Sequence, residues 1–190
     1  LFEINNMPVV SGSSGQNVAD SLAKILQMDY VRLEDRRFPD GEGYVRVPSE
    51  EINKIRSEPV ILVSNTFPDS SILKTIFLLK AIEDVRKGDL SNMKGEEPQK
   101  ISDVGKGIIL AIPYYGYSRQ DKRFSKGEVI SAEVIADIVS NYCDGMVILD
   151  LHEKKVMDNL DFPIIFVSSM KEIAEKLEKE VSPDFILSPD

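Results

Sequence analysis

The chain has 190 residues and a net charge of -9, with 42% hydrophobic and 29% charged residues. This composition is ordinary for a soluble globular protein of one large or two small domains, and the acidic balance argues against a general nucleic-acid or anionic-membrane surface. The single cysteine, Cys143, excludes an intramolecular disulfide and a cysteine metal cluster. No stretch has the length and apolarity of a transmembrane helix, and no signal peptide is recognisable. We therefore expect a cytoplasmic protein with no nucleic-acid and no membrane partner.

The N-terminal region predicts a strand, a small turn and a helix. Residues 1–6 match no pattern and are treated as an extension, whereas residues 7–11 are typical of a short strand. Residues 11–15 contain only serine and glycine, and apolar residues follow at helical spacing: Val18, Leu22, Ile25 and Leu26. Such a turn suits a phosphate cradle, but it lacks the lysine of a P-loop and the third glycine of a dinucleotide motif. We favour a strand-to-helix turn with a serine cap.

Residues 29–33 predict a second strand, which leads into a hairpin. Pro39 fixes φ and Gly41 permits positive φ, so the hairpin turn is fully explained by local chemistry. The turn leaves Phe38 at an exposed tip beside Asp40 and Glu42. An exposed ring next to carboxylates suits a purine, because the ring stacks and the carboxylates accept hydrogen bonds from an exocyclic amine. On these residues alone, both interpretations stay open.

The middle of the chain predicts a buried strand and a long helix. Residues 59–64 form a β-branched apolar run, and Asp69 is a candidate N-cap. The helix that follows is expected to turn four residues inward: Ile72, Ile76, Leu79 and Ile82. Residues 87–106 are polar and long for a connection, so we expect a surface loop and assign it no chemistry.

The densest group of functional candidates follows the apolar strand at residues 107–112. The strand ends at Pro113, and the next residues are three tyrosines around a glycine, then three cations: Arg119, Lys122 and Arg123. In open α/β sheets, ligands bind at the carboxyl ends of the strands. A concentration of cations in an otherwise acidic protein predicts that this loop binds an anion. Phosphate is the natural candidate, since arginine grips it bidentately and lysine neutralises it.

A helix and another strand lead to the only histidine of the chain. The helix is expected to place four apolar residues on one face: Ile130, Val134, Ile138 and Tyr142. The strand at residues 146–149 ends in Asp150 and His152, which alternation would place on one side. A lone histidine is usually exposed or capped. Because this one follows a strand end beside an acid, we favour a metal or phosphate contact, although Mg²⁺ prefers oxygen ligands.

The last segment predicts one more strand–helix unit. Residues 162–167 read as a strand, and Ser168 and Ser169 are expected to cap a helix with an inward face of Ile173, Leu177 and Val181. Residues 184–187 begin a further strand. Alternating strands and helices predict an α/β fold with a mostly parallel sheet and flanking helices. We place an N-terminal α/β domain at 1–152 and the incomplete beginning of a second domain at 153–190.

Five segments, in order and in register, resemble the ribose-phosphate pyrophosphokinase (phosphoribosyl pyrophosphate synthetase) family. They are Phe-Pro-Asp-Gly-Glu at 38–42, Ile-Pro-Tyr-Tyr-Gly-Tyr-Ser-Arg-Gln-Asp at 112–121, Gly-Glu-Val-Ile-Ser-Ala at 127–132, Leu-Asp-Leu-His at 149–152 and Leu-Ser-Pro-Asp at 187–190. The resemblance runs from about residue 7 to 190 and concerns the N-terminal part of the family. It implies two phosphoribosyltransferase-type domains, here with the second truncated. It also implies a kinase of nucleotide biosynthesis that transfers diphosphate from ATP to ribose 5-phosphate with Mg²⁺, yielding phosphoribosyl pyrophosphate and AMP.

The resemblance also implies roles for individual residues and a homo-oligomer, either a dimer or a hexamer. The adenine would be held by the hairpin of a neighbouring subunit, through Phe38, Asp40, Gly41 and Glu42. Arg119 and Gln120 would contact ATP, with Arg119 near its phosphates. His152 and Asp190 would lie at the Mg²⁺ site, and no residue of this chain is assigned a catalytic role.

The sequence departs from the family pattern in several places. The family's catalytic loop and ribose-phosphate loop lie beyond residue 190, so we expect the chain to be inactive alone. The loop at 87–106 is longer than usual, Gly43 replaces a larger residue, and the Glu-Lys-Lys at 153–155 differs from the common continuation. Two alternatives stay open: a non-catalytic regulatory relative of the synthetase, and a generic nucleotide-binding α/β module.

Overall fold

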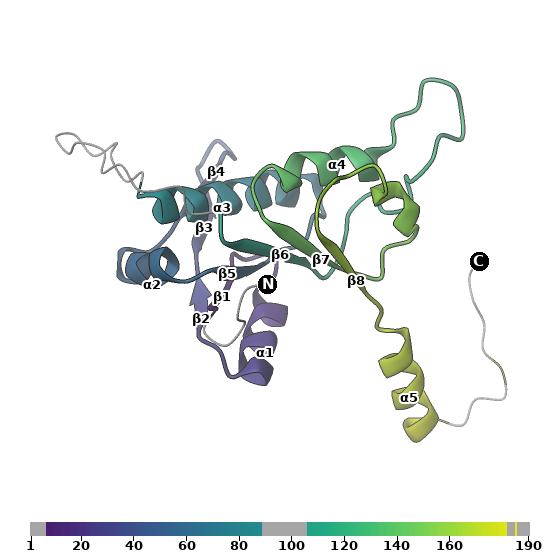
Figure 1. Ribbon diagram of the computed structural model, residues 1–190, viewed down its shortest axis with the longest axis horizontal. Coiled ribbons are helices and arrows are strands. Elements are labelled where there is room, and N and C mark those ends of the chain that lie inside the picture. Colours follow the sequence, from purple (N-terminus) through teal and green to yellow (C-terminus); the bar gives the residue numbers. More distant parts are fainter. Residues whose placement is uncertain (1–6, 89–105, 182–184, 186–190) are drawn as a thin grey trace.

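The computed structural model describes residues 7–88, 106–181 and 185, and its centre is a six-stranded sheet (Figure 1). The sheet has the order β2-β1-β5-β6-β7-β8, and every pairing in it is parallel. Its strands are β1 (Val9–Ser11), β2 (Tyr30–Arg32), β5 (Val60–Val63), β6 (Ile108–Ile112), β7 (Gly145–Leu149) and β8 (Ile164–Val167). The predicted fold class, a mostly parallel sheet with flanking helices, is confirmed.

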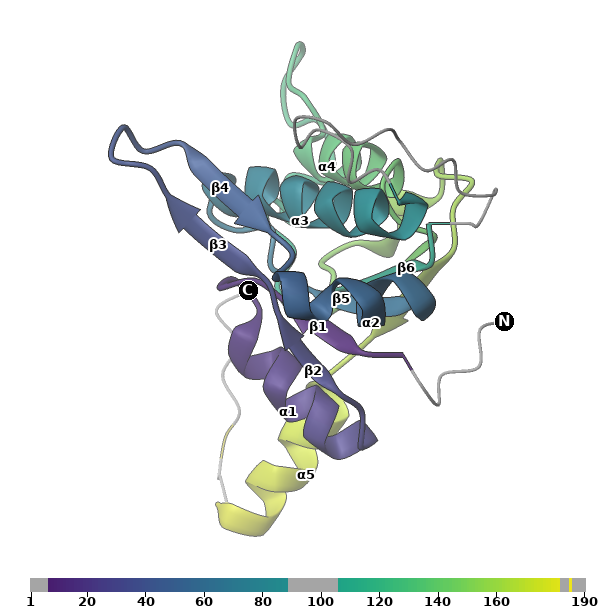
Figure 2. The same cartoon turned by 90° about the vertical axis from the view of Figure 1, so that its left-hand side faces the viewer.

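Helices cover both faces of this sheet, and a hairpin extends from it (Figures 1 and 2). The α-helices are α1 (Gln16–Leu26), α2 (Ile52–Ser57), α3 (Asp69–Lys87), α4 (Ser131–Ser140) and α5 (Met170–Glu180). Short 3-10 turns are η2 (Ser49–Glu51) and η3 (Lys154–Met157). The antiparallel hairpin consists of β3 (Glu34–Arg37) and β4 (Gly43–Arg46). The expected hairpin is therefore confirmed.

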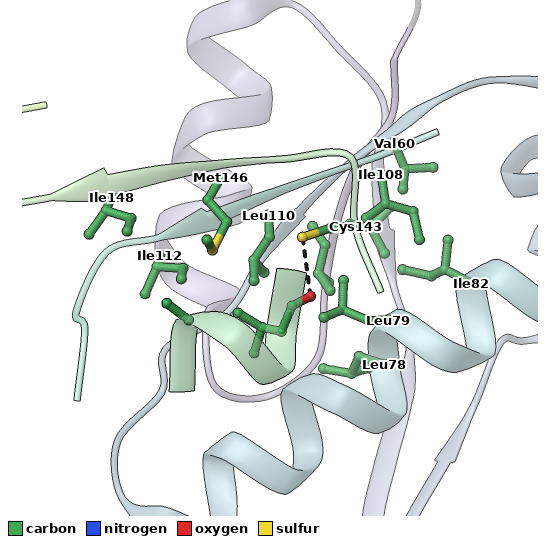
Figure 3. Close-up of a cluster of buried hydrophobic side chains, with 14 of the residues drawn as sticks. Val60, Leu78, Leu79, Ile82, Ile108, Leu110, Ile112, Cys143, Met146 and Ile148 are labelled. Atoms are coloured by element: carbon green, nitrogen blue, oxygen red, sulfur yellow. Dashed lines mark hydrogen bonds between the residues drawn. The ribbon is translucent and has the colours of Figure 1, made fainter. Parts of the chain in front are cut away.

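The core lies in two parts, one on each face of the sheet. The larger part packs strand residues such as Leu110 and Met146 against Leu79 and Ile82 of α3, together with α4 (Figure 3). The smaller part lies under α1, where Ala19 and Ala23 meet β1 and β5. Parallel strands covered on both faces need nearly continuous apolar runs, which β5, β6 and β7 have.

The start of α3 differs in detail from the prediction. Asp69 is the first helical residue and Pro68 occupies the N-cap position, so Asp69 is not the cap. Of the residues expected to face inward, Leu79 and Ile82 are fully buried, whereas Ile72 and Ile76 are partly buried against the core. The predicted inward face is confirmed in its second half.

The apolar face predicted for α4 is not its most buried face, and the inward face predicted for α5 is wrong. In α4 the buried residues are Ala132, Ile135, Ala136 and Val139. Of the four residues predicted on one apolar face, Val134 and Ile138 are 45% and 39% exposed, whereas Ile130 and Tyr142 are partly buried against the core. The buried stripe of α4 therefore combines two alanines with Ile135 and Val139. In α5 no residue is buried, and Ile173, Leu177 and Val181 are all about half exposed.

The domain boundary placed between residues 152 and 153 stays a prediction. β8, which follows residue 152, pairs in parallel with β7 and so continues the sheet of the first domain. Helix α5 extends away from that sheet (Figures 1 and 2). The expected strand at 184–187, the loop at 89–105 and the extension at 1–6 lie outside the described residues. None of the helices that the structure describes combines the length and apolarity needed to cross a membrane.

Candidate functional site

The carboxyl ends of β5, β6 and β7 carry three loops that meet at one edge of the sheet. Backbone contacts join the first two: Gly116 N donates to Thr66 Oγ1 at 2.7 Å and Tyr114 N donates to Asn65 Oδ1 at 3.0 Å. A Cβ on Gly116 would stand 2.2 Å from Thr66 O, so only glycine fits there. Backbone N–H groups of the predicted ligand loop are therefore held by side chains of the neighbouring loop.

The far part of this loop is fixed to the N-terminus of α4. The hydroxyl of buried Tyr115 donates to Ala132 O at 2.7 Å, and burial raises the pKa of Tyr115, which keeps the phenol protonated. Gln120 accepts from Ser131 Oγ at 3.2 Å through its side chain. Gln120 is thus held at the loop's inner edge.

A cavity of about 430 Å³ lies between these two loops, and Arg119 is the one cation among its described lining residues. The walls are Phe67, Asp69, Tyr114, Tyr117, Ser118, Arg119, Gln120 and Phe124. Tyr117 donates its hydroxyl to Asp69 at 2.6 Å, and this hydrogen bond raises the pKa of Tyr117. The structure brings Arg119 and Gln120 together in the wall of one cavity.

The other two predicted cations of the loop serve different contacts. The ammonium of Lys122 lies 5.2 Å from the ring centre of Phe124, and Arg123 Nε donates to Glu128 O at 2.9 Å. Neither lines the cavity. Of the cationic cluster, then, only Arg119 faces the cavity.

His152 from the third loop contacts Asp121 of the second. Its Nδ1 lies 2.9 Å from Asp121 Oδ2; the Asp121 side chain is 6% exposed, whereas that of His152 is 53% exposed. This hydrogen bond lowers the pKa of Asp121. An ionised carboxylate accepts, so Nδ1 carries the proton and Nε2 is the ring nitrogen left for a ligand. The sequence interpretation missed Asp121, although the signal was an acid within the cationic run, between Arg119 and Lys122.

Asp150 does not lie beside His152 as alternation predicted. β7 ends at Leu149, and Asp150 has a left-handed φ of 47°, so the extended conformation stops there. The carboxylate of Asp150 accepts from Ser168 Oγ at 2.9 Å and from both the backbone N–H and the hydroxyl of Ser169. Hydrogen bonds from Ser169 lower the pKa of Asp150. Its role is to hold the start of α5.

The hairpin tip has the exposed aromatic that the sequence predicted. Gly41, with φ 95°, completes a turn in which Phe38 N donates to Glu42 O at 2.8 Å. Asp40 Oδ1 accepts from Glu42 N at 3.0 Å, so one oxygen of Asp40 is part of the turn. Phe38 is 38% exposed and packs edge-on against Tyr44, with ring centres 5.7 Å apart.

A second cavity, of about 440 Å³, is lined by residues of this hairpin and of α3. It is lined by Arg36, Arg37, Gly41, Glu42, Gly43, Tyr44, Val45, Ser70, Leu73, Lys74 and Phe77. It shares no lining residue with the first cavity. Figures 1 and 2 show that the hairpin and the loop after β6 project from different parts of the molecule. One chain therefore does not bring the hairpin residues and Arg119 into a single pocket.

The remaining predictions concern the Ser/Gly turn at residues 11–15 and the metal contact of Asp190. Gly15, not a serine, occupies the N-cap position of α1, and no side chain caps that helix. The donors of Ser13 are already taken by the carboxylate of Asp35, so the phosphate-cradle interpretation has no support. Asp190 lies outside the described residues, and the described residues contain no group of three metal-ligating side chains.

Comparisons with known proteins point to one family. Residues 102–142 match the model of the N-terminal domain of ribose phosphate pyrophosphokinase. The ribose-phosphate pyrophosphokinase of Methanobrevibacter smithii is 32% identical over 96% of this chain and 55% of its own length, and that of Saccharolobus solfataricus is 33% identical over 97% and 57%. The chain thus spans about half the length of these curated relatives.

A solved structure agrees with the sequence comparisons. The crystal structure of phosphoribosylpyrophosphate synthetase from Mycobacterium smegmatis has a TM-score of 0.72 at 21% identity, covering 92% of this chain and 52% of that one. At this identity the match shows the fold. Over nearly its whole length the chain is therefore similar to the N-terminal part of ribose-phosphate pyrophosphokinases, which confirms the resemblance that its motifs predicted.

Proposed function

We propose that this chain is the ATP-binding part of a cytoplasmic ribose-phosphate pyrophosphokinase. In the reaction, the 1-hydroxyl oxygen of ribose 5-phosphate attacks the β-phosphorus of ATP. The bond from that phosphorus to the α,β-bridging oxygen breaks, AMP leaves, and the hydroxyl proton passes to solvent or base. The observation that carries this proposal is the cavity between the loops after β5 and β6, with Arg119 and Gln120 in its wall.

Arg119 and Gln120 are proposed to bind the phosphates of ATP. Diphosphoryl transfer needs little covalent help from a protein; it needs alignment of the phosphates and neutralisation of their charge. A guanidinium in a cavity walled by Phe67 and Tyr114 supplies both, because its donors are fixed in a fork that matches phosphate oxygens.

The metal of the proposed reaction is Mg²⁺, which neutralises phosphate oxygens when it is bound. His152 and Asp121 fit a hydrated Mg²⁺, which usually keeps several waters and takes few protein ligands. The buried Asp121 offers an oxygen, and its hydrogen bond fixes the orientation of His152. Asp190 is proposed as a further contact on the basis of the sequence motif.

The adenine is proposed to lie against the hairpin of a neighbouring subunit. Phe38 offers an exposed ring, and Asp40, Gly41 and Glu42 form the turn beside it. The separation of the two cavities within one chain supports this arrangement. It requires a homo-oligomer, a dimer or a hexamer, with ATP and ribose 5-phosphate as its small-molecule partners.

The test of this function is the substitution Arg119→Ala in the complete protein. A hydrogen bond to a charged group contributes about 1.5–3 kcal/mol, so kcat/KM for ATP should fall about 10- to 150-fold. Lys126→Ala is the matched control, because Lys126 is an exposed cation of the same loop outside the cavity. Unchanged kinetics in Arg119→Ala would remove Arg119 from the site.

The 190-residue chain alone is proposed to bind Mg–ATP without producing phosphoribosyl pyrophosphate. The reason is that these 190 residues span only about half the length of the curated relatives. Product formation would be measured with ribose 5-phosphate and Mg–ATP, and robust synthesis would refute the proposal. Because the relatives are named pyrophosphokinases, the alternative of a non-catalytic regulatory relative is not favoured.

A further inference from the structure

One carboxylate is buried at the base of the β3–β4 hairpin. Residues 34–46 are half-buried or exposed throughout, and beyond Asp35 the strand β3 lies open to solvent up to the tip. The side chain of Asp35, in contrast, is 1% exposed. A buried charge costs free energy unless it is paired and hydrogen-bonded, so its partners show what it holds.

The partners of Asp35 come from two other elements. Ser13, in the turn between β1 and α1, donates its backbone N–H at 3.0 Å and its hydroxyl at 2.6 Å. Lys74 of α3 forms an ion pair at 2.9 Å and also donates to Ser13 Oγ at 2.8 Å. Each of the three residues contacts the other two, so the hairpin, the turn and the helix are joined at one point.

The surroundings of this point are tightly packed. A Cβ on Gly12 would stand 3.0 Å from Leu78 Cδ1 and 3.2 Å from Asp35 Oδ2. Burial by itself would raise the pKa of Asp35, but the hydrogen bonds from Ser13 and Lys74 hold it below its ordinary value. The carboxylate is therefore ionised at neutral pH, as the ion pair with Lys74 requires.

We propose that Asp35 and Lys74 are positioning residues, which hold the nucleotide-contacting tip of the hairpin in place by fixing its base to α3 and to the β1–α1 turn. This inference rests on the proposed function, since the tip carries Phe38, Asp40 and Glu42. Neither Asp35 nor Lys74 was among the residues that the sequence motifs suggested. Lys74 also lines the cavity between hairpin and helix, on the α3 side.

A small rotation at the base of a hairpin displaces the side chains at its tip. Phe38 is three residues beyond Asp35, and strands rise about 3.3 Å per residue, so the ring lies about 10 Å from the attachment point. A pivot of roughly 10° at the base moves such a ring by about 2 Å, and a misplacement of about 1 Å is enough for a 100-fold effect on a reaction. Loss of the base contacts should therefore weaken recognition of the adenine.

The test compares two ligands in the purified protein in its native assembly. Mg–ATP carries the adenine, whereas Mg–tripolyphosphate offers only the phosphates that the loop after β6 would bind. The variants are Asp35→Asn, which places an amide against the Lys74 ammonium, and Lys74→Met, which removes the cation from the half-buried partner of Asp35. The circular dichroism spectrum of each variant should match that of the unaltered protein, which shows that the fold is kept. Glu34→Gln is the matched control, because Glu34 pairs with Arg36 and Arg46 within the hairpin.

Both variants should weaken Mg–ATP binding about 10-fold, the loss that corresponds to one hydrogen bond to a charged group. Their affinity for Mg–tripolyphosphate should match that of the unaltered protein, as measured by calorimetry. Backbone order parameters of residues 36–44, from ¹⁵N relaxation, should fall from about 0.85 to below about 0.6 in the variants. Glu34→Gln should match the unaltered protein in all three measurements.

Three results separate this inference from the proposed function. Unchanged Mg–ATP affinity in both variants would overturn the positioning role. Equal losses for Mg–ATP and Mg–tripolyphosphate would overturn it too, since they would show a general loss of structure. If the unaltered protein binds neither ligand, the proposed function fails, and the positioning role fails with it.

Discussion

At the scale of single residues, the candidate site separates the groups that hold the loops from the groups that face a ligand. Gly116 and Tyr115 fix the loop after β6 through contacts with Thr66 and Ala132. Arg119 lines the cavity, and the hydrogen bond to Asp121 orients His152. Substitutions of the first group should change folding, whereas substitutions of the second should change binding.

The pKa of Asp35 gives a pH-dependent prediction at this scale. Its folded pKa is below the unfolded value of about 3.9, so its stabilising contribution is present above that pH and is lost as pH falls through the folded pKa. Asp35→Asn should therefore lower the free energy of unfolding at pH 7 by about 1–3 kcal/mol, and the difference from the unaltered protein should shrink toward pH 3.

Urea unfolding of the two proteins at pH 7 and at pH 3 measures this difference. A difference of the same size at both pH values would show that the charge of Asp35 does not contribute. Glu34→Gln serves again as the control, because the side chain of Glu34 is 35% exposed and its ion pairs should contribute little.

At the scale of elements, the sequence was a good guide to which segments are strands and helices and a poor guide to which side of a helix is buried. Apolar runs marked β5, β6 and β7, because strands covered on both faces must be apolar throughout. In α4, by contrast, alanines at 132 and 136 lie against the sheet while Val134 and Ile138 face outward. Periodicity alone could not choose between these two stripes, since both are apolar.

Helix α5 provides a test of this interpretation. Leu177 is 49% exposed, so Leu177→Ala should change the free energy of unfolding by no more than about 0.5 kcal/mol. Leu79→Ala is the matched variant in the core of α3, where Leu79 is fully buried, and should cost about 2–5 kcal/mol. Thermal and urea unfolding would compare them. A large loss in Leu177→Ala would show that its side chain is packed against other residues.

In the candidate site, too, the sequence indicated local features but not the contacts between residues far apart in the chain. The cationic run after β6 indicated a ligand loop, because its charge stood out from an acidic chain. The pairing of Asp121 with His152 needs strands β6 and β7 to be neighbours, and a single sequence does not fix strand order. The partners of Asp35 are likewise 22 and 39 residues away, so no local pattern joins them.

At the scale of the whole molecule, the proposed ATP site is divided between two cavities that one chain keeps apart. The hairpin residues line one, and Arg119 lines the other. If neighbouring subunits complete each other's sites, two variants that are each impaired in a different half of the site should regain activity when they assemble together. This is a property of the oligomer, and no single-subunit site has it.

The prediction is tested by mixing Phe38→Ala and Arg119→Ala variants of the complete protein. In a mixed dimer, one site receives both substitutions and the other receives neither, so random mixing of equal amounts should recover about a quarter of the unaltered activity. Each variant refolded alone is the control. Recovery no greater than the sum of the two controls would place Phe38 and Arg119 in the same subunit's site.

The contact between Gly116 and Thr66 has a consequence for which residues of the loop can be substituted during evolution. The N–H groups of Tyr114 and Gly116 and the buried side chain of Tyr115 hold the path of the loop. Side chains of the loop that make none of these contacts can therefore be exchanged without altering that path. Position 116 is then closed to variation, while positions such as 119 and 122 are open to it. A loop of this kind allows new ligand preferences to arise by single substitutions on an unchanged scaffold.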